Sequence, residues 1–186
     1  MTNLAGTERR IDVGAWLRYG IVGGIIAGVT FAMFEMIMAV VLDGGDAFFM
    51  PLRMIGGIGL GKQALDPGTS LVTAGGAGLV IHMILSMMYG VVVAAVLSLI
   101  PQLSASRAAV LISASVAGFA LWIVNFYVLA PAFGWTWFPN NTNPAVQFVA
   151  HTFLYGSMLG LLLDRTYFQP ARGLAKATAP GRRDDT

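Results

Sequence analysis

Apolar residues fall into four long stretches, separated by polar or glycine-rich segments. The stretches cover approximately residues 19–42, 72–100, 106–130 and 144–164. A helix needs about 20 apolar residues to cross the hydrocarbon core of a bilayer. Pro101, Pro131 and Pro144 stand where helices end or begin. The pattern predicts an all-α, single-domain fold, a four-helix transmembrane bundle over residues 19–165.

The segments outside the four stretches differ in character. Residues 1–18 and 166–186 are polar, and we expect a cytoplasmic N-terminal segment and a cytoplasmic tail. Residues 43–71 mix glycines with aromatic and aliphatic side chains, which predicts an irregular segment in the membrane interface between the first two helices. A re-entrant segment there would have to be shielded by protein. Residues 131–143 are rich in tryptophan and uncharged, which is typical of an interfacial aromatic belt.

Lysine and arginine are distributed unequally between the two sides of this predicted bundle. One side holds Arg9, Arg10, Arg18, Arg107, Arg165, Arg172, Lys176, Arg182 and Arg183, and the other holds Arg53 and Lys62. Loops rich in lysine and arginine stay in the cytoplasm. The bias therefore predicts that both chain ends are cytoplasmic.

Composition supports the membrane interpretation and excludes several functions. The chain is 56% hydrophobic and 11% charged, whereas soluble domains carry about 25% charged residues. The absence of cysteine excludes disulfides, iron–sulfur clusters and thiolate metal sites. The cations form no basic face interleaved with aromatic residues, so we expect the partner to be the lipid bilayer and not nucleic acid.

Small residues recur at four-residue spacing in three of the stretches. They are Gly20, Gly24 and Gly28 in the first, Ala114 and Gly118 in the third, and Gly156 and Gly160 in the fourth. Such stripes let helix backbones approach closely in lipid. They predict a compact bundle, and its long apolar perimeter is compatible with a homo-oligomer or a larger membrane complex.

Each stretch also carries one strongly polar side chain. These are Glu35, His82, Asn125 and His151, and at about 1.5 Å per residue all four fall at a similar depth in the outer half of the bilayer. Polar groups in hydrocarbon usually face the bundle interior or a cavity. Ser86, Gln147 and Tyr155 lie one turn from the histidines, so we expect one buried polar cluster of these seven residues.

Three interpretations of the cluster remain open. The four groups could satisfy one another, with Glu35 neutral or paired to a histidine, and hold the helices in register. His82 and His151 could bind a cofactor, as axial ligands of a b-type haem, or join Glu35 in a zinc or iron site. Glu35 and the histidines could instead relay protons, or bind a polar substrate or a quinone head group.

Catalytic motifs are missing from the chain. There is no Gly-x-Ser-x-Gly elbow, no His-Glu-x-x-His motif and no dinucleotide fingerprint with its acidic partner. We therefore expect no catalytic residues and a non-enzymatic accessory or structural membrane subunit with a buried Glu-His-Asn-His cluster. The alternatives are a haem- or metal-binding electron carrier and a proton-coupled transporter or channel that works as an oligomer.

The last three stretches carry a set of short motifs that resembles a known family. The motifs are Ile81-His82 with Ser86, Gly118 and Trp122, Pro131, Phe138-Pro139-Asn140, and His151 with Tyr155. Together they resemble the YagU-like inner-membrane proteins of bacteria. The resemblance implies a small multi-pass protein of the bacterial inner (cytoplasmic) membrane, in a family whose molecular activity is not established. It draws attention to His82 and His151 without naming a reaction.

Overall fold

The structure is a computed structural model that describes residues 13–177, the side chain of Lys176 excepted. Within this range the chain is helical and contains no strand. Four helices are long and apolar enough to cross a membrane, which confirms the predicted all-α transmembrane bundle. Arg9, Arg10, Arg182 and Arg183, which contribute to the predicted charge bias, lie outside the described residues.

The four long helices include three π-helical segments. The first long helix is α1 (Val13–Asp43) and the second is α3 (Leu71–Leu99). The third long helix joins α4 (Arg107–Val124), η4 (Asn125–Leu129) and α5 (Ala130–Ala132). The fourth joins α7 (Pro144–Val149), η5 (Ala150–Ser157), α8 (Met158–Leu163), η6 (Asp164–Phe168) and α9 (Gln169–Ala177). Segments η4, η5 and η6 are the π-helices. The connections contain η1 (Gly45–Ala47), α2 (Met50–Leu60), η2 (Lys62–Leu65), η3 (Pro101–Ser104) and α6 (Trp137–Asn140).

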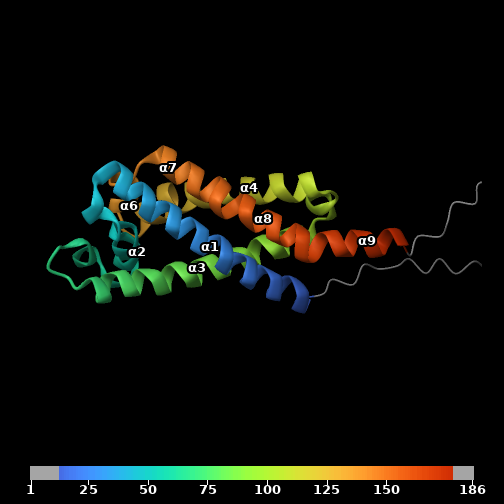
Figure 1. Cartoon of the computed structure of the whole chain (residues 1–186), viewed down its shortest axis with the longest axis horizontal. Helices are drawn as coiled ribbons and strands as arrows, with labels where there is room; N and C mark the ends of the chain where they lie inside the picture. Colours follow the sequence, from blue (N-terminus) through green and yellow to red (C-terminus); the bar gives the residue numbers. More distant parts are fainter. Residues whose placement is uncertain (1–12, 178–186) are drawn as a thin grey trace, which may run out of the picture.

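The start of α1 and the end of α9 lie at the same end of the bundle (Figure 1). Helices α2 and α6 lie at the opposite end. The chain runs along the bundle four times, so both described chain ends lie on the same side. We call the half that contains Leu97, Val110, Leu159 and Leu163 the terminal half, and the half next to α2 and α6 the distal half.

Local signals explain where two of the helices begin. Ser106 caps α4, and its hydroxyl accepts a hydrogen bond of 3.1 Å from the backbone N–H of Ala109. Asn143 caps α7 by accepting from the backbone of Ala145 at 2.9 Å. Pro144 follows at the first helical position, where its missing N–H costs nothing.

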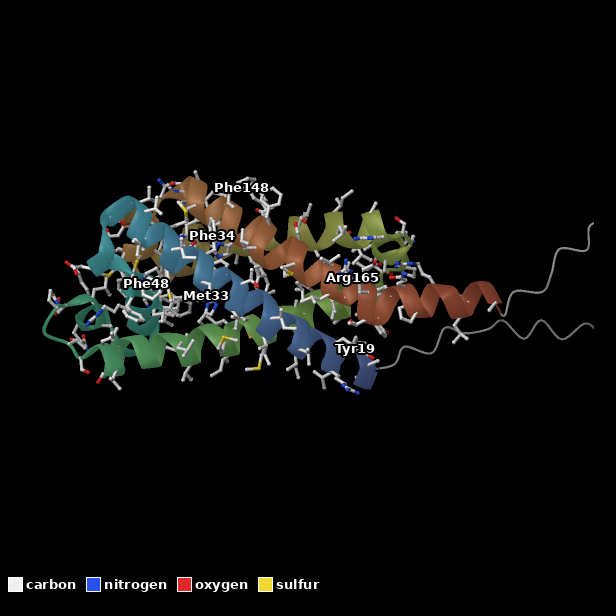
Figure 2. All side chains as sticks on the ribbon, viewed as in Figure 1. Tyr19, Met33, Phe34, Phe48, Phe148 and Arg165 are labelled. Atoms are coloured by element: carbon white, nitrogen blue, oxygen red, sulfur yellow. The ribbon has the colours of Figure 1, made fainter. Side chains whose placement is uncertain are left out.

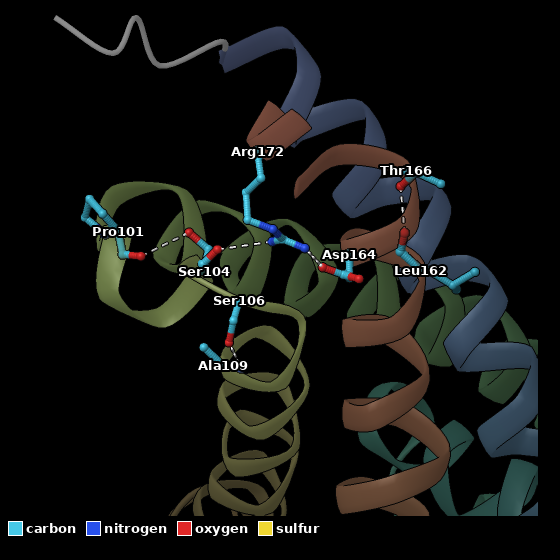
Figure 3. A network of polar contacts seen from close by, with 8 residues as sticks. All are labelled: Pro101, Ser104, Ser106, Ala109, Leu162, Asp164, Thr166 and Arg172. Carbon is cyan, nitrogen blue, oxygen red and sulfur yellow. Dashed lines mark hydrogen bonds and ion pairs between the residues drawn. The ribbon is translucent and has the colours of Figure 1, made fainter. Parts of the chain in front are cut away.

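Two long helices extend further than the apolar pattern predicts. Helix α1 begins at Val13, and the fourth helix continues through residues 166–177 of the predicted tail. A hydropathy pattern detects only the part of a helix that matches the hydrocarbon, while the backbone hydrogen bonds continue beyond it. In the extension, the guanidinium of Arg172 donates to the Asp164 carboxylate and to the Ser104 carbonyl (Figure 3).

Glycines bring α1 and α3 into backbone contact. A Cβ added at Gly24 would lie 2.3 Å from the Ser86 carbonyl oxygen, and one at Gly90 would lie 2.3 Å from the Gly20 carbonyl oxygen. Gly28 lies beside the Ser86 side chain in the same interface. The predicted stripe in the first helix is therefore a helix–helix contact, and Gly90 is its unpredicted counterpart in the second.

The third and fourth helices form a similar pair. A Cβ added at Gly118 would lie 2.1 Å from the His151 carbonyl oxygen, and one at Gly156 would lie 2.6 Å from the Ala114 carbonyl oxygen. Gly160 meets the Ala114 side chain. The bundle is thus assembled from two glycine-mediated helix pairs.

The connection between the first two spans is more regular than the sequence predicts. It contains the helix α2, which packs closely on the first half of α3. A Cβ at Gly56 would lie 2.2 Å from the Ala74 carbonyl oxygen, and one at Gly78 only 1.8 Å from that of Leu52. The glycines that broke the apolar pattern of this connection are the residues that permit its packing, which is why the pattern obscured the helix.

Arg53 ties the rest of this connection to α2. Its guanidinium donates to the backbone carbonyls of Ala64 at 3.1 Å, Asp66 at 3.2 Å and Thr69 at 2.8 Å. Three donated bonds occupy the cation within the connection itself.

The interior and perimeter of the bundle are both apolar. In the terminal half, Leu97, Val110, Leu159 and Leu163 are at most 1% exposed. Around the perimeter, apolar side chains project outward along the helices, among them Met33 and Phe148 (Figure 2). Such a perimeter suits contact with lipid chains.

Candidate functional site

The distal half of the bundle contains a partly open cavity of about 400 Å³. Its walls come from all four long helices, with the π-helical segments η4 and η5 among them, from α2, and from the connection that contains α6. All seven residues of the predicted polar cluster line it: Glu35, His82, Ser86, Asn125, Gln147, His151 and Tyr155. The tertiary structure thus brings the polar groups of four helices to one largely apolar space.

Glu35 lies inside this space and is only 8% exposed. Its Oε2 accepts a hydrogen bond of 2.8 Å from Nε2 of Gln147. Its Oε1 is buried and has no hydrogen-bond partner among the described residues. Glu35 is thus hydrogen-bonded to Gln147 and not to a histidine, which leaves a neutral Glu35 as the remaining option of the first interpretation.

The two imidazoles are anchored by backbone carbonyls. Nε2 of His82 lies 2.8 Å from the Gly28 carbonyl oxygen, and Nδ1 of His151 lies 2.9 Å from the Gln147 carbonyl oxygen. A carbonyl only accepts, so each of these nitrogens carries the donated proton. In the neutral imidazoles, Nδ1 of His82 and Nε2 of His151 therefore keep their lone pairs. Neither atom has a hydrogen-bond partner within the described chain.

Two tyrosines complete the polar part of the wall. The Tyr155 hydroxyl donates to the Ser86 carbonyl oxygen at 2.6 Å, and the Tyr89 hydroxyl donates to Oδ1 of Asn125 at 2.9 Å. Sequence reasoning missed Tyr89, which also lines the cavity. Its spacing of three residues from Ser86 and seven from His82 places all three on one helical face and could have identified it.

Three of the polar residues lie on π-helical backbone. Asn125 begins η4, while His151 and Tyr155 lie within η5. π-Helical turns are rare in proteins and occur frequently at functional sites. Segment η5 is also where the backbone of His151 approaches Gly118. The irregular backbone therefore coincides with both the glycine contact and the cavity wall.

Aromatic rings surround the imidazoles. The Phe31 ring centroid lies 5.4 Å from that of His82 and 4.7 Å from that of His151. Phe126 lies 5.5 Å from His151 on another side. Axial ligation by both histidines requires a porphyrin between the two imidazoles, but Phe31 already contacts both rings. The residues present therefore do not fit a haem held by His82 and His151.

A metal site built from these residues is also not supported. Among residues 13–177, no group of three or more His, Cys, Asp or Glu side chains is arranged to hold a metal ion. The zinc or iron site of Glu35, His82 and His151, one of the alternatives that the sequence left open, therefore has no support in the described residues. The physical reason is that one Glu35 oxygen is bonded to Gln147 and each imidazole is turned by its own backbone acceptor.

Fold and cavity together define a small multi-pass membrane protein with an internal, mostly apolar chamber that contains a few anchored polar groups. Comparison of the chain with protein-family models, curated proteins and solved structures finds no match in any of the three. The geometry of this chamber is therefore the basis for assigning a function.

Proposed function

We propose that this protein is a non-enzymatic membrane protein that binds a small, largely apolar molecule with a polar head group in the distal cavity. The observation that carries the proposal is the gathering of seven polar side chains on one cavity of about 400 Å³. Ligand pockets of this size are typically apolar and contain a few convergent polar groups. Polar side chains are costly within a membrane, so their gathering at one empty space favours a functional role.

The hydrogen bonding supports binding over a purely structural role. A structural cluster would satisfy its members mutually. Here Glu35 keeps one unpartnered oxygen, and His82 and His151 are bonded to backbone carbonyls. Bonds of this kind orient side chains for a further partner, as backbone carbonyls orient the imidazoles of metal-binding histidines. The head group of a bound molecule would be that partner.

A pore through one protomer is not favoured. The cavity extends from Tyr155 toward Asp43 and Asn141 at the distal end. In the terminal half, Leu97 and Leu159 occupy the interior of the bundle and are at most 1% exposed. Apolar side chains thus fill the interior of the terminal half, which suits a binding chamber confined to the distal half.

The cellular context forms part of the same proposal. We place the protein in the bacterial inner membrane with cytoplasmic chain ends, as an accessory subunit alone, as a homo-oligomer or in a larger complex. The YagU-like motifs and the charge bias support this placement. Among the described residues, Arg18, Arg107, Arg165 and Arg172 lie on elements at the terminal end, and Arg53 and Lys62 lie on elements at the distal end.

Photolabelling in lipid nanodiscs would test the chamber. A neutral phenyl diazirine should label the buried lining residues Met54, His82 and Tyr155 as well as lipid-facing positions. An Ala39→Trp substitution should fill the cavity and remove only the buried labels, because Ala39 lines the wall. The matched control is Ile37→Trp, since Ile37 is 51% exposed on the same helix. Labelling that is confined to the lipid face of the unmodified protein would refute the proposal.

A further inference from the structure

Apart from the two imidazoles, the ionisable groups of the cavity wall are acidic. Glu35 and Asp43 contribute carboxyl groups, and no lysine or arginine is among the lining residues. Arg53 is the cation closest in sequence to the lining residues of α2. Its guanidinium donates hydrogen bonds to three backbone carbonyls of the connection that follows. An anionic head group would therefore meet carboxyl groups without a compensating cation, at a cost that rises in a low-dielectric interior.

Among the buried side-chain atoms of the described residues that have no hydrogen-bond partner, the one that lies on the cavity wall is an acceptor, Oε1 of Glu35. A carboxylate offers about four acceptor sites over two oxygens, yet only one bond to Glu35 is formed, and Oε1 is buried without a partner among the described residues. The neutral imidazoles add the lone pairs of His82 Nδ1 and His151 Nε2. A ligand that donates hydrogen bonds would satisfy groups that the chain itself leaves unpaired.

Aromatic faces complete the environment. Phe31, Tyr89, Phe126, Trp135 and Phe138 line the same cavity. Cations are attracted to aromatic faces within about 6 Å of the ring centroid, and more strongly where water is excluded. The body of such a ligand would be covered by the aliphatic residues of the remaining wall.

The distal rim carries the second carboxyl group. Asp43 ends α1, and Asn141, Thr142 and Asn143 precede α7. All four line the cavity. A polar rim with one acidic residue favours the approach of positively charged molecules over negatively charged ones.

We infer that the ligand of this cavity is an organic cation, a protonated amine with an apolar body. The inference rests on the proposed function, because it specifies the chemistry of the molecule that the chamber binds. The unpartnered Glu35 oxygen receives the ammonium group, the imidazole lone pairs accept hydrogen bonds from its remaining N–H groups, and the aromatic rings surround the charge.

Three matched ligands test this inference. 4-Phenylbutylamine, 4-phenylbutanol and 4-phenylbutyrate share one body and differ only in the head group. Their affinities would be measured by equilibrium dialysis against the protein in phosphatidylcholine nanodiscs, with empty nanodiscs subtracting partition into lipid. We expect the amine to bind at least about tenfold more tightly than the alcohol, as a charge-assisted hydrogen bond and cation–π contacts require. The butyrate should bind most weakly.

A matched pair of variants assigns the preference to the site. Glu35→Gln should reduce amine affinity to that of the alcohol, whose own affinity should change less than about twofold because it carries no charge to lose. Asp46→Asn removes one carboxyl group from an exposed position outside the cavity and should change nothing. Monodisperse elution and an unchanged melting temperature would verify that Glu35→Gln is folded.

Failure of this inference is distinguishable from failure of the proposed function. Equal affinities for amine and alcohol, tightest binding of the butyrate, or an unchanged amine preference in Glu35→Gln would each overturn the cation inference and leave the binding chamber standing. If none of the three ligands binds, the inference is overturned, and the photolabelling pattern decides whether the chamber binds any molecule.

Discussion

Leu97, Val110, Leu159 and Leu163 occupy the interior of the terminal half and are at most 1% exposed. In the distal half the same four helices line a partly open cavity of about 400 Å³. The terminal half is closed by the pairing of Arg172 with Asp164, whereas the distal half is covered by α2 and α6. The comparison separates residues that hold the bundle together from residues that line a space within it.

The two halves also differ in how their buried carboxyl groups are satisfied. In the terminal half, the carboxylate of Asp164 is 1% exposed and has a guanidinium partner. In the distal half, Glu35 is similarly buried but keeps one oxygen unpaired within the described chain. A folded protein rarely leaves such an atom unpaired without a reason. The difference fits a structural role for the first carboxyl group and supports the proposed binding role of the second.

The largest effect is expected where helix backbones touch. Gly118→Leu should destabilise the bundle by at least about 3 kcal/mol, because its Cβ would lie 2.1 Å from the His151 carbonyl oxygen. Thermal unfolding in detergent measures the change. Gly76→Leu is the control, since a Cβ there meets nothing within 4 Å. Equal melting temperatures for the two variants would show that the glycine contact is not needed.

A smaller loss is expected at the terminal half's ion pair. Arg172→Met should cost about 2 kcal/mol, because it leaves the buried Asp164 without its cation while the 21% exposure of Arg172 moderates the loss. Adding Asp164→Leu should restore most of the stability. Arg165→Met changes an exposed arginine and should be nearly neutral. If the double variant is no more stable than Arg172→Met, the pair does not act as a unit.

A still smaller loss of stability is expected where α6 is tied to α2, the two helices that cover the distal half. Trp137 donates from Nε1 to the Met54 carbonyl oxygen at 3.0 Å and so ties α6 to α2. Trp137→Phe should cost about 1 kcal/mol and speed hydrogen exchange in α2. Trp135→Phe keeps the aromatic stacking on Phe133 and serves as the control. Unchanged exchange in α2 would show that this bond does not hold the cover.

Within the cavity we expect the smallest effect on stability. Glu35→Gln keeps an acceptor for the Gln147 amide and removes a buried carboxyl group, so unfolding should change by less than about 1 kcal/mol. Unfolding in the absence of added ligand provides the measurement. A loss comparable to that of Gly118→Leu would assign Glu35 to the framework of the bundle and would erase the distinction between the two halves.

The positions of the spans could be predicted because each is decided locally. A segment in lipid must satisfy its own backbone hydrogen bonds, so about 20 apolar residues are sufficient to define a helix. The stripes of Gly20, Gly24 and Gly28 and of Gly156 and Gly160 were visible for the same reason, since four-residue spacing places residues on one face of a helix. Helix α2 was not predicted, because its glycines serve a contact with α3 that no local pattern contains.

The sequence by itself determined that polar groups of four helices share one depth, since depth depends only on distance along each helix. Only the tertiary structure decided how they pair. The partner of Glu35 is 112 positions away at Gln147, and that of His82 is a backbone carbonyl 54 positions away at Gly28. Every residue has a backbone carbonyl, so the sequence does not reveal which carbonyl will accept a hydrogen bond. A cavity exists only where the packed helices leave space between them. The binding chamber therefore became visible only when all four helices were in place.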